Sequence, residues 1–383
     1  MVLSRFCSIN GLQEAETLTA GLDFRLPQYR RAVFLRFYDF HIRYRSHPGC
    51  VYYLFPYMTR KLGLDREQQL WLAFINGNTQ NPVMSYLIMK EFPDLASINH
   101  DNFKKWFDAS WSKLDFDIDR RRQKKLLPDA VKNYKEIVDY HGKGSQEAMF
   151  NEFIRKDKTK SNFKNIWSLV REGFTGFGRL SSFSYLEYLR IMGLDIECDD
   201  LFLEDYSGSM SHRNGILKVI GRDELETWRE NPSFIRQYTD EEIEWLRKEA
   251  QSLLQDAREF SRKNKNPYLD DVGYFTIESA LCTYKGWFRK DRRYSNVYND
   301  MLYNRIKKAE SLWENEDFML FWQARKACLP KYLRLEDCPG DPGLSKPKQN
   351  HYRLTGEPIM MENDFPEFRN SFSEIVKAKV INL

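Results

Sequence analysis

Apolar residues recur along most of this 383-residue chain at intervals of three and four, and runs that alternate at every second position are scarce. Intervals of three and four place side chains on one face of an α-helix, whereas strict alternation is typical of a half-buried strand. The pattern therefore predicts an all-α protein.

The clearest predicted helix starts after Thr239. Thr239 and Glu242 have the spacing of a capping box, in which each side chain binds the backbone N–H of the other residue. We expect this helix to end between Asn264 and Pro267. The apolar face that supports it consists of Ile243, Leu246, Ala250, Leu253, Leu254, Ala257 and Phe260.

A polar turn interrupts the helical pattern earlier in the chain. A helix is predicted over residues 66–75, and the polar sequence from Asn76 to Pro82 follows it. Asn81 suits the N-cap and Pro82 the first position of the next helix. Asn76 and Asn78 are then either amides that contact a base or turn residues with left-handed φ.

A glycine turn joins two further predicted helices near residues 165–190. Gly176 and Gly178 flank one phenylalanine, and glycine permits a tight turn with positive φ and close approach of backbone N–H groups to a phosphate. This pattern is similar to a helix-hairpin-helix, and a plain turn between two packed helices is the alternative. The candidate DNA-contacting residues are Gly176, Gly178, Arg179, Ser181 and Ser182, of which the arginine adds charge and the serines can cap the second helix.

The composition indicates a globular protein with clustered positive charge. Hydrophobic residues make up 42% of the chain, which supports an ordinary core, and the 15% aromatic content also offers flat surfaces for stacking on bases. The net charge of +4 is too small to establish nucleic-acid binding. The basic runs contain Arg120, Arg121, Arg122, Lys124 and Lys125, then Arg155, Lys156, Lys158, Lys160 and Lys164, then Arg289, Lys290, Arg292 and Arg293.

Cysteine and histidine spacing gives no sign of a metal centre. The six cysteines form no C-x-x-C pair and the six histidines no H-x-x-x-H array, so we expect no metal site. No signal peptide and no apolar run of about 18 residues is present, so a soluble protein of a reducing cytoplasm, without a membrane partner, is expected.

The chain is predicted to contain three regions. Residues 1–25 are expected to form a weakly patterned N-terminal extension, and residues 26–325 a helical domain that carries any catalytic residues. Residues 326–383 contain the turn-rich segment CPGDPGLSKP at 338–347 and are expected to form a C-terminal arm.

Residues 69–214 resemble the helical DNA glycosylase superfamily. That resemblance implies that Gln80 enters DNA beside an extruded base, that the glycine hairpin grips phosphates, and that Asp205 faces the sugar. Glycosylases that also cleave the strand place a lysine two residues after the second glycine of the hairpin, where this chain has Leu180. A Schiff-base lyase is therefore disfavoured.

Four polar clusters carry a more specific resemblance. They are FYDFHIRYRSHPGC at 37–50, INGNTQNP at 75–82, DYSGSMSHRNG at 205–215 and FTIESALCTYKGWF at 275–288. Together they resemble the alpha-glutamyl/putrescinyl thymine pyrophosphorylase group of bacteriophages, also called amino acid:DNA transferases. The resemblance implies a phage enzyme of the host cytoplasm. It acts on double-stranded DNA in which hydroxymethyluracil carries a pyrophosphate, and an amino acid or polyamine amine displaces that pyrophosphate.

The residue types in these clusters suit that chemistry. A protonated amine needs a base, a departing pyrophosphate needs cations and N–H donors, and a uracil edge needs amide partners. The candidate bases are Asp205, Glu278 and Asp39. The candidate substrate-binding residues are Asn76, Asn78, Gln80, His41, Arg45, His47, Ser209, His212, Arg213, Asn214 and Lys285, with Arg43 as a second candidate for a donor carboxylate. No cofactor is expected, apart from any Mg²⁺ that accompanies pyrophosphate.

Two other functions fit some of these features. A glycosylase that hydrolyses a modified base would use Asp205 to stabilise a cationic sugar. A non-enzymatic helix-hairpin-helix DNA-binding protein would need the glycine hairpin but would leave the four polar clusters unexplained.

Overall fold

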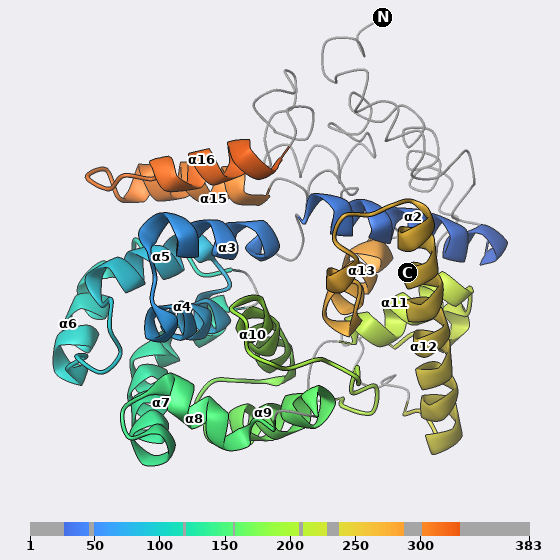
Figure 1. The fold of residues 1–383 in the computed structure, drawn as a ribbon, viewed down its shortest axis with the longest axis horizontal. Helices are drawn as coiled ribbons and strands as arrows, with labels where there is room; N and C mark the ends of the chain where they lie inside the picture. Colours follow the sequence, from blue (N-terminus) through green and yellow to red (C-terminus); the bar gives the residue numbers. More distant parts are fainter. Residues whose placement is uncertain are drawn as a thin grey trace, which may run out of the picture. The chain divides into compact units, whose positions relative to one another are not determined.

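The protein is described here by a computed structural model that covers residues 27–45, 50–117, 120–155, 158–206, 210–227, 237–286 and 301–329. Within these ranges the regular elements are helices and no strand occurs, so the predicted all-α class is confirmed (Figure 1). The predicted N-terminal extension, His47, Ser209, the third basic run and all but the first few residues of the predicted C-terminal arm lie outside the described residues.

The described residues divide into two compact units. The first contains residues up to 50, residues 200–304 and residues from 325 onward; the second contains residues 51–199 and 305–324. The division falls inside α15 (Met301–Leu312) and α16 (Met319–Cys328). That residues 26–325 form one catalytic domain stays a prediction.

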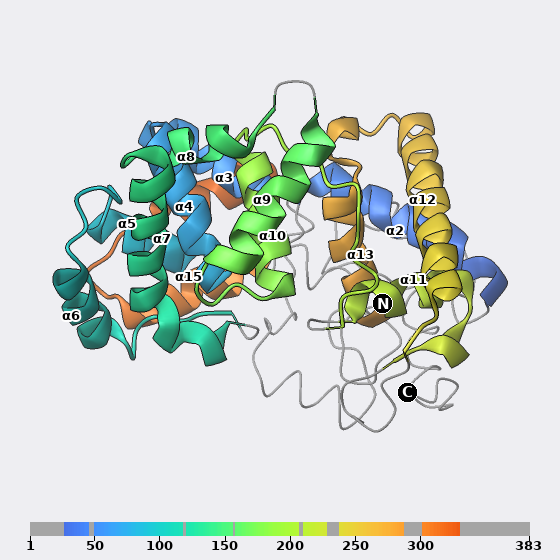
Figure 2. The ribbon, with the colours of Figure 1, turned by 90° about the horizontal axis from the view of Figure 1, so that it is seen from below.

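The first unit is built on α2 (Pro27–Tyr44), α11 (Ser211–Ile220), α12 (Asp240–Lys263) and α13 (Tyr274–Gly286). Helix α11 packs against both α13 and α2, and α12 packs against α2 (Figures 1 and 2). Two short 3-10 turns, Asp223–Leu225 and Leu269–Asp271, follow α11 and precede α13.

Helix α12 confirms the predicted capping box. The Thr239 hydroxyl accepts a hydrogen bond from the Glu242 N–H at 3.2 Å, and the Thr239 N–H donates to the Glu242 carboxylate at 3.0 Å. The helix ends at Lys263, beside the predicted limit, and its predicted apolar face is buried except for the half-buried Phe260.

The second unit surrounds α4 (Arg66–Thr79). Helix α4 packs against α5, α8 and α10, and the Phe74 ring stacks on Tyr134 with 3.8 Å between ring centroids. The other helices of the unit are α3 (Val51–Leu62), α5 (Pro82–Glu91), α6 (His100–Ser110), α7 (Leu127–Gly142), α8 (Gln146–Phe153), α9 (Thr159–Gly173) and α10 (Arg179–Ile191), with a 3-10 segment at Arg121–Leu126.

Helix α4 is longer than the sequence predicted. It continues to Thr79, so Asn76 and Asn78 are helical and their interpretation as left-handed turn residues is wrong. Among residues 76–82, Gln80 is the one with left-handed backbone, with φ 49° and ψ 25°. The predicted start of α5 is confirmed, since Asn81 caps it by accepting the Val83 N–H and Pro82 is its first residue.

The two helices predicted around the glycine turn are present as α9 and α10 (Figure 2). Gly176 has φ +80°, as a tight turn requires, but Gly178 has φ −87°, so positive φ was expected wrongly there. The expected serine cap is also wrong. Gly178 is the N-cap of α10 without any side-chain cap, and the Ser181 hydroxyl instead donates to the Gly178 carbonyl at 3.1 Å.

Candidate functional site

A close crossing of helices α11 and α13 in the first unit is made possible by Gly215 on α11. A Cβ atom at this position would lie 2.6 Å from the Leu281 Cβ and 2.7 Å from the Leu281 carbonyl oxygen. Only a residue without a side chain allows the backbones of α11 and α13 to approach this closely. The first turn of α11 is thereby held against α13.

That first turn of α11 buries polar side chains rather than apolar ones. Ser211, His212, Arg213 and Asn214 are each 6% exposed or less. A buried polar side chain costs free energy unless it finds hydrogen-bonding partners, so four consecutive ones require a reason beyond packing. This turn is therefore a candidate functional site.

Helix α13 supplies a carboxylate and an ammonium group on one face. Glu278 is 4% exposed, and Lys285 lies two turns further along the helix. The Lys285 ammonium donates a hydrogen bond to the Ser211 hydroxyl, which joins this face of α13 to the first turn of α11. A carboxylate and an ammonium group therefore come from one helix.

Arg213 holds the turn that carries Asp205. Its guanidinium is fully buried and donates to the carbonyl oxygens of Leu203 and, at 3.2 Å, of Asp205. It also lies 4.3 Å from the centre of the Tyr206 ring, and the Tyr206 hydroxyl accepts the Tyr238 N–H at 2.8 Å. The Asp205 side chain itself is half-buried. These contacts fix the backbone on which a base would be presented.

Asn214 has a structural partner. Its amide donates to the Thr227 carbonyl at 2.7 Å and accepts the Thr227 N–H at 3.0 Å. Because both ends of the amide are engaged by one backbone position, a base-binding role for Asn214 stays a prediction that these contacts do not favour.

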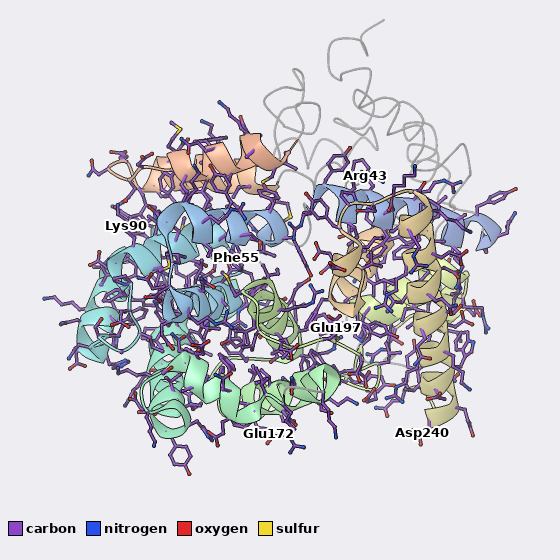
Figure 3. The ribbon with its side chains drawn as sticks, viewed as in Figure 1. Arg43, Phe55, Lys90, Glu172, Glu197 and Asp240 are labelled. Atoms are coloured by element: carbon purple, nitrogen blue, oxygen red, sulfur yellow. The ribbon has the colours of Figure 1, made fainter. Side chains whose placement is uncertain are left out.

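Helix α2 brings Asp39 and His41 into the same unit. The Asp39 carboxylate accepts a hydrogen bond from the Asn266 amide at 2.7 Å and lies 3.5 Å from Arg43. Arg43 lies at the end of α2 and also donates to the Asn264 carbonyl at 3.0 Å (Figure 3). The Asp39 carboxylate thus already ties α2 to the end of α12, while the His41 ring meets Phe37 edge-on.

Arg45 follows α2 and forms an ion pair and a ring contact. Its guanidinium lies 3.1 Å from the Asp271 carboxylate and 4.5 Å from the centre of the Tyr268 ring. About a quarter of its side chain is exposed, at 26%, so the positive charge is accessible to a ligand.

The predicted amides at the end of α4 lie in the second unit and differ in exposure. Asn76 is fully buried and accepts the Ser85 hydroxyl at 3.0 Å, and the Asn78 amide donates to the Phe74 carbonyl at 3.0 Å. Gln80 is half-buried, and its amide is 3.4 Å from the Ser184 hydroxyl on α10. Of the three, only Gln80 is accessible to DNA without rearrangement.

The hairpin turn presents an open helix N-terminus. Nothing lies within 4 Å of a Cβ atom built at Gly178, and no side chain caps α10. Uncapped N–H groups and the positive end of the helix dipole favour an anion such as phosphate. Arg179, in contrast, is 1% exposed and lies 5.7 Å from the Phe183 ring, so direct phosphate contact by its side chain stays a prediction that burial does not favour.

The first basic run is divided by the fold. Arg121, Arg122 and Lys125 are exposed, whereas Arg120 and Lys124 are buried. The Lys124 ammonium donates to the carbonyls of Trp111 and Leu114, and burial lowers its pKa. The two buried cations therefore organise backbone, which leaves three residues of the run for solvent or DNA.

A second buried charge cluster, which the sequence analysis missed, lies at the other end of α11. The Lys218 ammonium is 2.5 Å from the Glu226 carboxylate and 3.4 Å from Asp223, which also pairs with Arg30 at 2.5 Å. Burial raises the pKa of Glu226, and the charge of Lys218 opposes that rise. The spacing of these residues resembles ordinary surface charge, so no local signal in the sequence indicated their burial.

Neither a metal centre nor a membrane span is found among the described residues. No three His, Cys, Asp or Glu side chains in the described ranges are grouped so that they could hold a metal ion. Likewise, no helix in the part of the chain that the structure describes has the length and apolar character needed to cross a bilayer. The expectation that no metal is required stays a prediction.

Comparison with known proteins identifies the family to which this chain belongs. The family model of amino acid:DNA transferases matches residues 52–295. A protein of Salmonella phage ViI named serinyltransferase is 27% identical over 304 residues, which cover 76% of this chain and 72% of that protein. No solved structure matches the chain. The family match spans more than half of the sequence and includes the polar turn at the end of α4, the hairpin, α11 and α13, so this chain belongs to the amino acid:DNA transferase family and is a transferase enzyme.

Proposed function

We propose that this transferase replaces the pyrophosphate of an activated hydroxymethyluracil in double-stranded DNA with the amine of a small donor. The observation that carries the proposal is the first turn of α11, where four consecutive polar residues are buried and Ser211 binds Lys285 of α13, the helix that also carries the buried Glu278. Buried polar groups gathered at one place, in a chain of this family, are typical of an active site.

The reaction requires one bond to form and one to break. The amine nitrogen attacks the methylene carbon on the pyrimidine ring, and a C–N bond forms. The C–O bond to pyrophosphate breaks, and the leaving group keeps the electron pair. The proton of the donor ammonium passes to a carboxylate, for which Asp205 is the first candidate and Glu278 and Asp39 are the others.

Asp205 is favoured as the base by its exposure and support. It is half-buried, and Arg213 binds its backbone carbonyl, whereas Asp39 and Glu278 are buried. A general base must come within hydrogen-bonding reach of the bound amine, which favours the most exposed of the three carboxylates.

The donor is proposed to be an amino acid. The phage relative named serinyltransferase supports an amino acid over a polyamine. The carboxylate of such a donor needs a cation, and Lys285 offers one beside the N-terminus of α11, with Arg43 as the second candidate. His212 and Arg45 are proposed to bind the pyrophosphate, together with His47 and Ser209.

DNA binding is assigned to the second unit. Phosphate is proposed to meet the open N-terminus of α10 at Gly178, and Gln80 is proposed to face the extruded base. Flipping a base out of a duplex costs a few kcal/mol, which contacts of this kind can offset. Helices α9 and α10, joined by the glycine turn, support a glycosylase-like helix-hairpin-helix as the scaffold. A phage relative supports action in the host cytoplasm.

The experiment is a nucleoside analysis after reaction. Purified protein, duplex DNA containing the pyrophosphorylated base and serine as the first donor tested should release pyrophosphate and leave every glycosidic bond intact. Mass spectrometry should find thymidine that carries the donor. Free modified base and abasic sites would instead establish a glycosylase and overturn the proposal. A chelator that slows turnover without lowering stability would indicate Mg²⁺ that arrives with pyrophosphate.

A further inference from the structure

A single buried arginine connects the two turns that are proposed to meet DNA. Arg120 is 5% exposed although it opens a basic run. Its Nε donates to the Asn78 carbonyl at 2.9 Å, and its Nη1 donates to the Gly176 carbonyl at 3.0 Å. Asn78 lies two residues before Gln80, and Gly176 lies two residues before Gly178. One guanidinium therefore holds both turns.

The hydrogen bond from Arg120 to α4 satisfies a carbonyl at the C-terminus of that helix. The last carbonyls of a helix have no partner within it, and they carry the negative end of the helix dipole. Here the Asn78 carbonyl accepts from Arg120 and the Thr79 carbonyl accepts the Asp117 N–H at 2.9 Å. A guanidinium suits this position because it is positively charged and has several N–H donors for carbonyls that lack a partner within the helix.

The contact at the hairpin is supported by packing. The Arg120 guanidinium lies 5.8 Å from the centre of the Phe177 ring. Phe177 in turn lies against α4, because a Cβ atom built at Gly77 would be only 3.1 Å from its ring. The turn of the hairpin and the last turn of α4 are thus pressed together, with Arg120 hydrogen-bonded to both.

We infer that Arg120 is a positioning residue that sets the spacing between the Gln80 turn and the Gly176–Gly178 turn, and that it does not itself bind a DNA phosphate. The role on DNA rests on the proposed function, but the coupling of the two turns does not. A base-facing residue and a phosphate-binding turn act together only if their spacing is fixed before DNA arrives.

The variants for the test are Arg120→Lys and Arg120→Gln, with Arg122→Gln as the matched control. Arg122 belongs to the same basic run but is exposed. Lysine keeps the charge of Arg120 but lacks the planar fork, so it cannot reproduce two directed hydrogen bonds to separate carbonyls. Circular dichroism of each variant serves to check that it has the helical content of the wild type.

The first measurement is amide hydrogen exchange of the free protein. In Arg120→Lys, exchange should rise in residues 76–80 and in residues 176–179 together, while α7 and α8 stay protected. Arg122→Gln should change neither turn. Unchanged exchange in either turn would overturn the inference. A rise across the whole unit, or loss of fold in both Arg120 variants, would also overturn it, because Arg120 would then be a general stability residue.

The second measurement is the salt dependence of duplex affinity. Each phosphate contact contributes about 0.9 to the slope of log affinity against log salt. Arg120→Gln should leave that slope unchanged and lower turnover at saturating DNA by at least about tenfold. A slope reduced by about 0.9 would show that Arg120 binds phosphate, and the inference would fail. Wild-type protein that does not modify DNA would refute the proposed function separately, and the exchange result would still decide the coupling of the two turns.

Discussion

At the scale of single residues, the candidate carboxylates of the first unit differ in exposure. Asp39 and Glu278 are buried, whereas Asp205 is half-buried on a backbone that Arg213 holds. A general base must come within hydrogen-bonding reach of the substrate, so the more exposed carboxylate is the better candidate.

Asp205→Asn should retain DNA affinity and lose turnover by a factor on the order of 10² to 10⁴. The amide keeps the shape of the side chain but cannot take the ammonium proton. Single-turnover release of pyrophosphate, measured beside duplex affinity, separates the two effects. A fully active Asp205→Asn would move the role to Glu278 or Asp39 and leave the reaction class intact.

Glu67 provides a residue-scale test of stability. Its carboxylate accepts hydrogen bonds from the Ser145 hydroxyl at 2.7 Å and from the N–H groups of Gln146 and Glu147 at 2.8 and 3.0 Å, at the start of α8. Partial burial opposes ionisation, but these hydrogen bonds outweigh it and lower the pKa of Glu67 below its ordinary value of 4.5.

A lowered pKa in the folded state means that Glu67 stabilises the protein fully above pH 4.5 and that this contribution is lost as pH falls through the folded-state pKa. Glu67→Gln should therefore lower the melting temperature at pH 7. The difference from wild type should shrink as the pH is lowered below 4.5, and thermal melts at a series of pH values measure it. A difference that stays constant down to pH 3 would contradict this account.

At the scale of elements, local signals in the sequence predicted helix starts better than helix ends. The start of α12 follows from Thr239 and Glu242, and the start of α5 follows from Asn81 and Pro82, because each signal lies within a few residues. The end of α4 was misplaced because the carbonyls of its last turn are satisfied by Asp117 and Arg120, which lie about 40 residues away in sequence.

In the candidate site, too, local features were predictable from the sequence and features set by tertiary packing were not. The polar clusters were found because residue types and their order along the chain are visible in the sequence. The burial of Arg120, Arg179 and Arg213 was not predictable, because a basic residue in a helix is ordinarily expected on the exposed face and only tertiary packing decides otherwise. Side-chain roles that depend on burial therefore needed the structure.

The hairpin offers a test at the element scale. Gly178→Val should fit without strain, since φ is −87° and nothing lies within 4 Å of the new Cβ atom. If the N–H groups at this turn bind phosphate, the bulkier side chain should weaken duplex affinity by roughly tenfold, the equivalent of one lost hydrogen bond to a charged group. Equal affinity with unchanged helical content would remove the hairpin from DNA binding.

Gly176 serves as the contrasting control for that test. Its φ of +80° is strained for any residue with a side chain, so Gly176→Ala should lower the melting temperature as well as the affinity. The difference between the two glycines separates an effect on DNA approach from an effect on the turn itself.

At the scale of the whole molecule, the candidate groups fall into two sets. The carboxylates and cations proposed for chemistry belong to the first unit, and the hairpin and Gln80 belong to the second. The net charge of +4 is modest, so DNA affinity must arise from local contacts rather than from the overall field.

Duplex binding is therefore expected to depend strongly on salt and weakly on sequence. About five phosphate contacts should lower the affinity more than a hundredfold between about 50 and about 200 mM salt, because each contact releases counterions. The proposed contacts are backbone N–H groups and exposed cations, which recognise phosphate and carry no base code. Titrations of two unrelated duplexes at four salt concentrations measure both properties. Affinity that ignores ionic strength would contradict phosphate binding by the second unit. A large difference between the two duplexes would require contacts to base edges in the grooves, beyond the proposed contact of Gln80 with the extruded base.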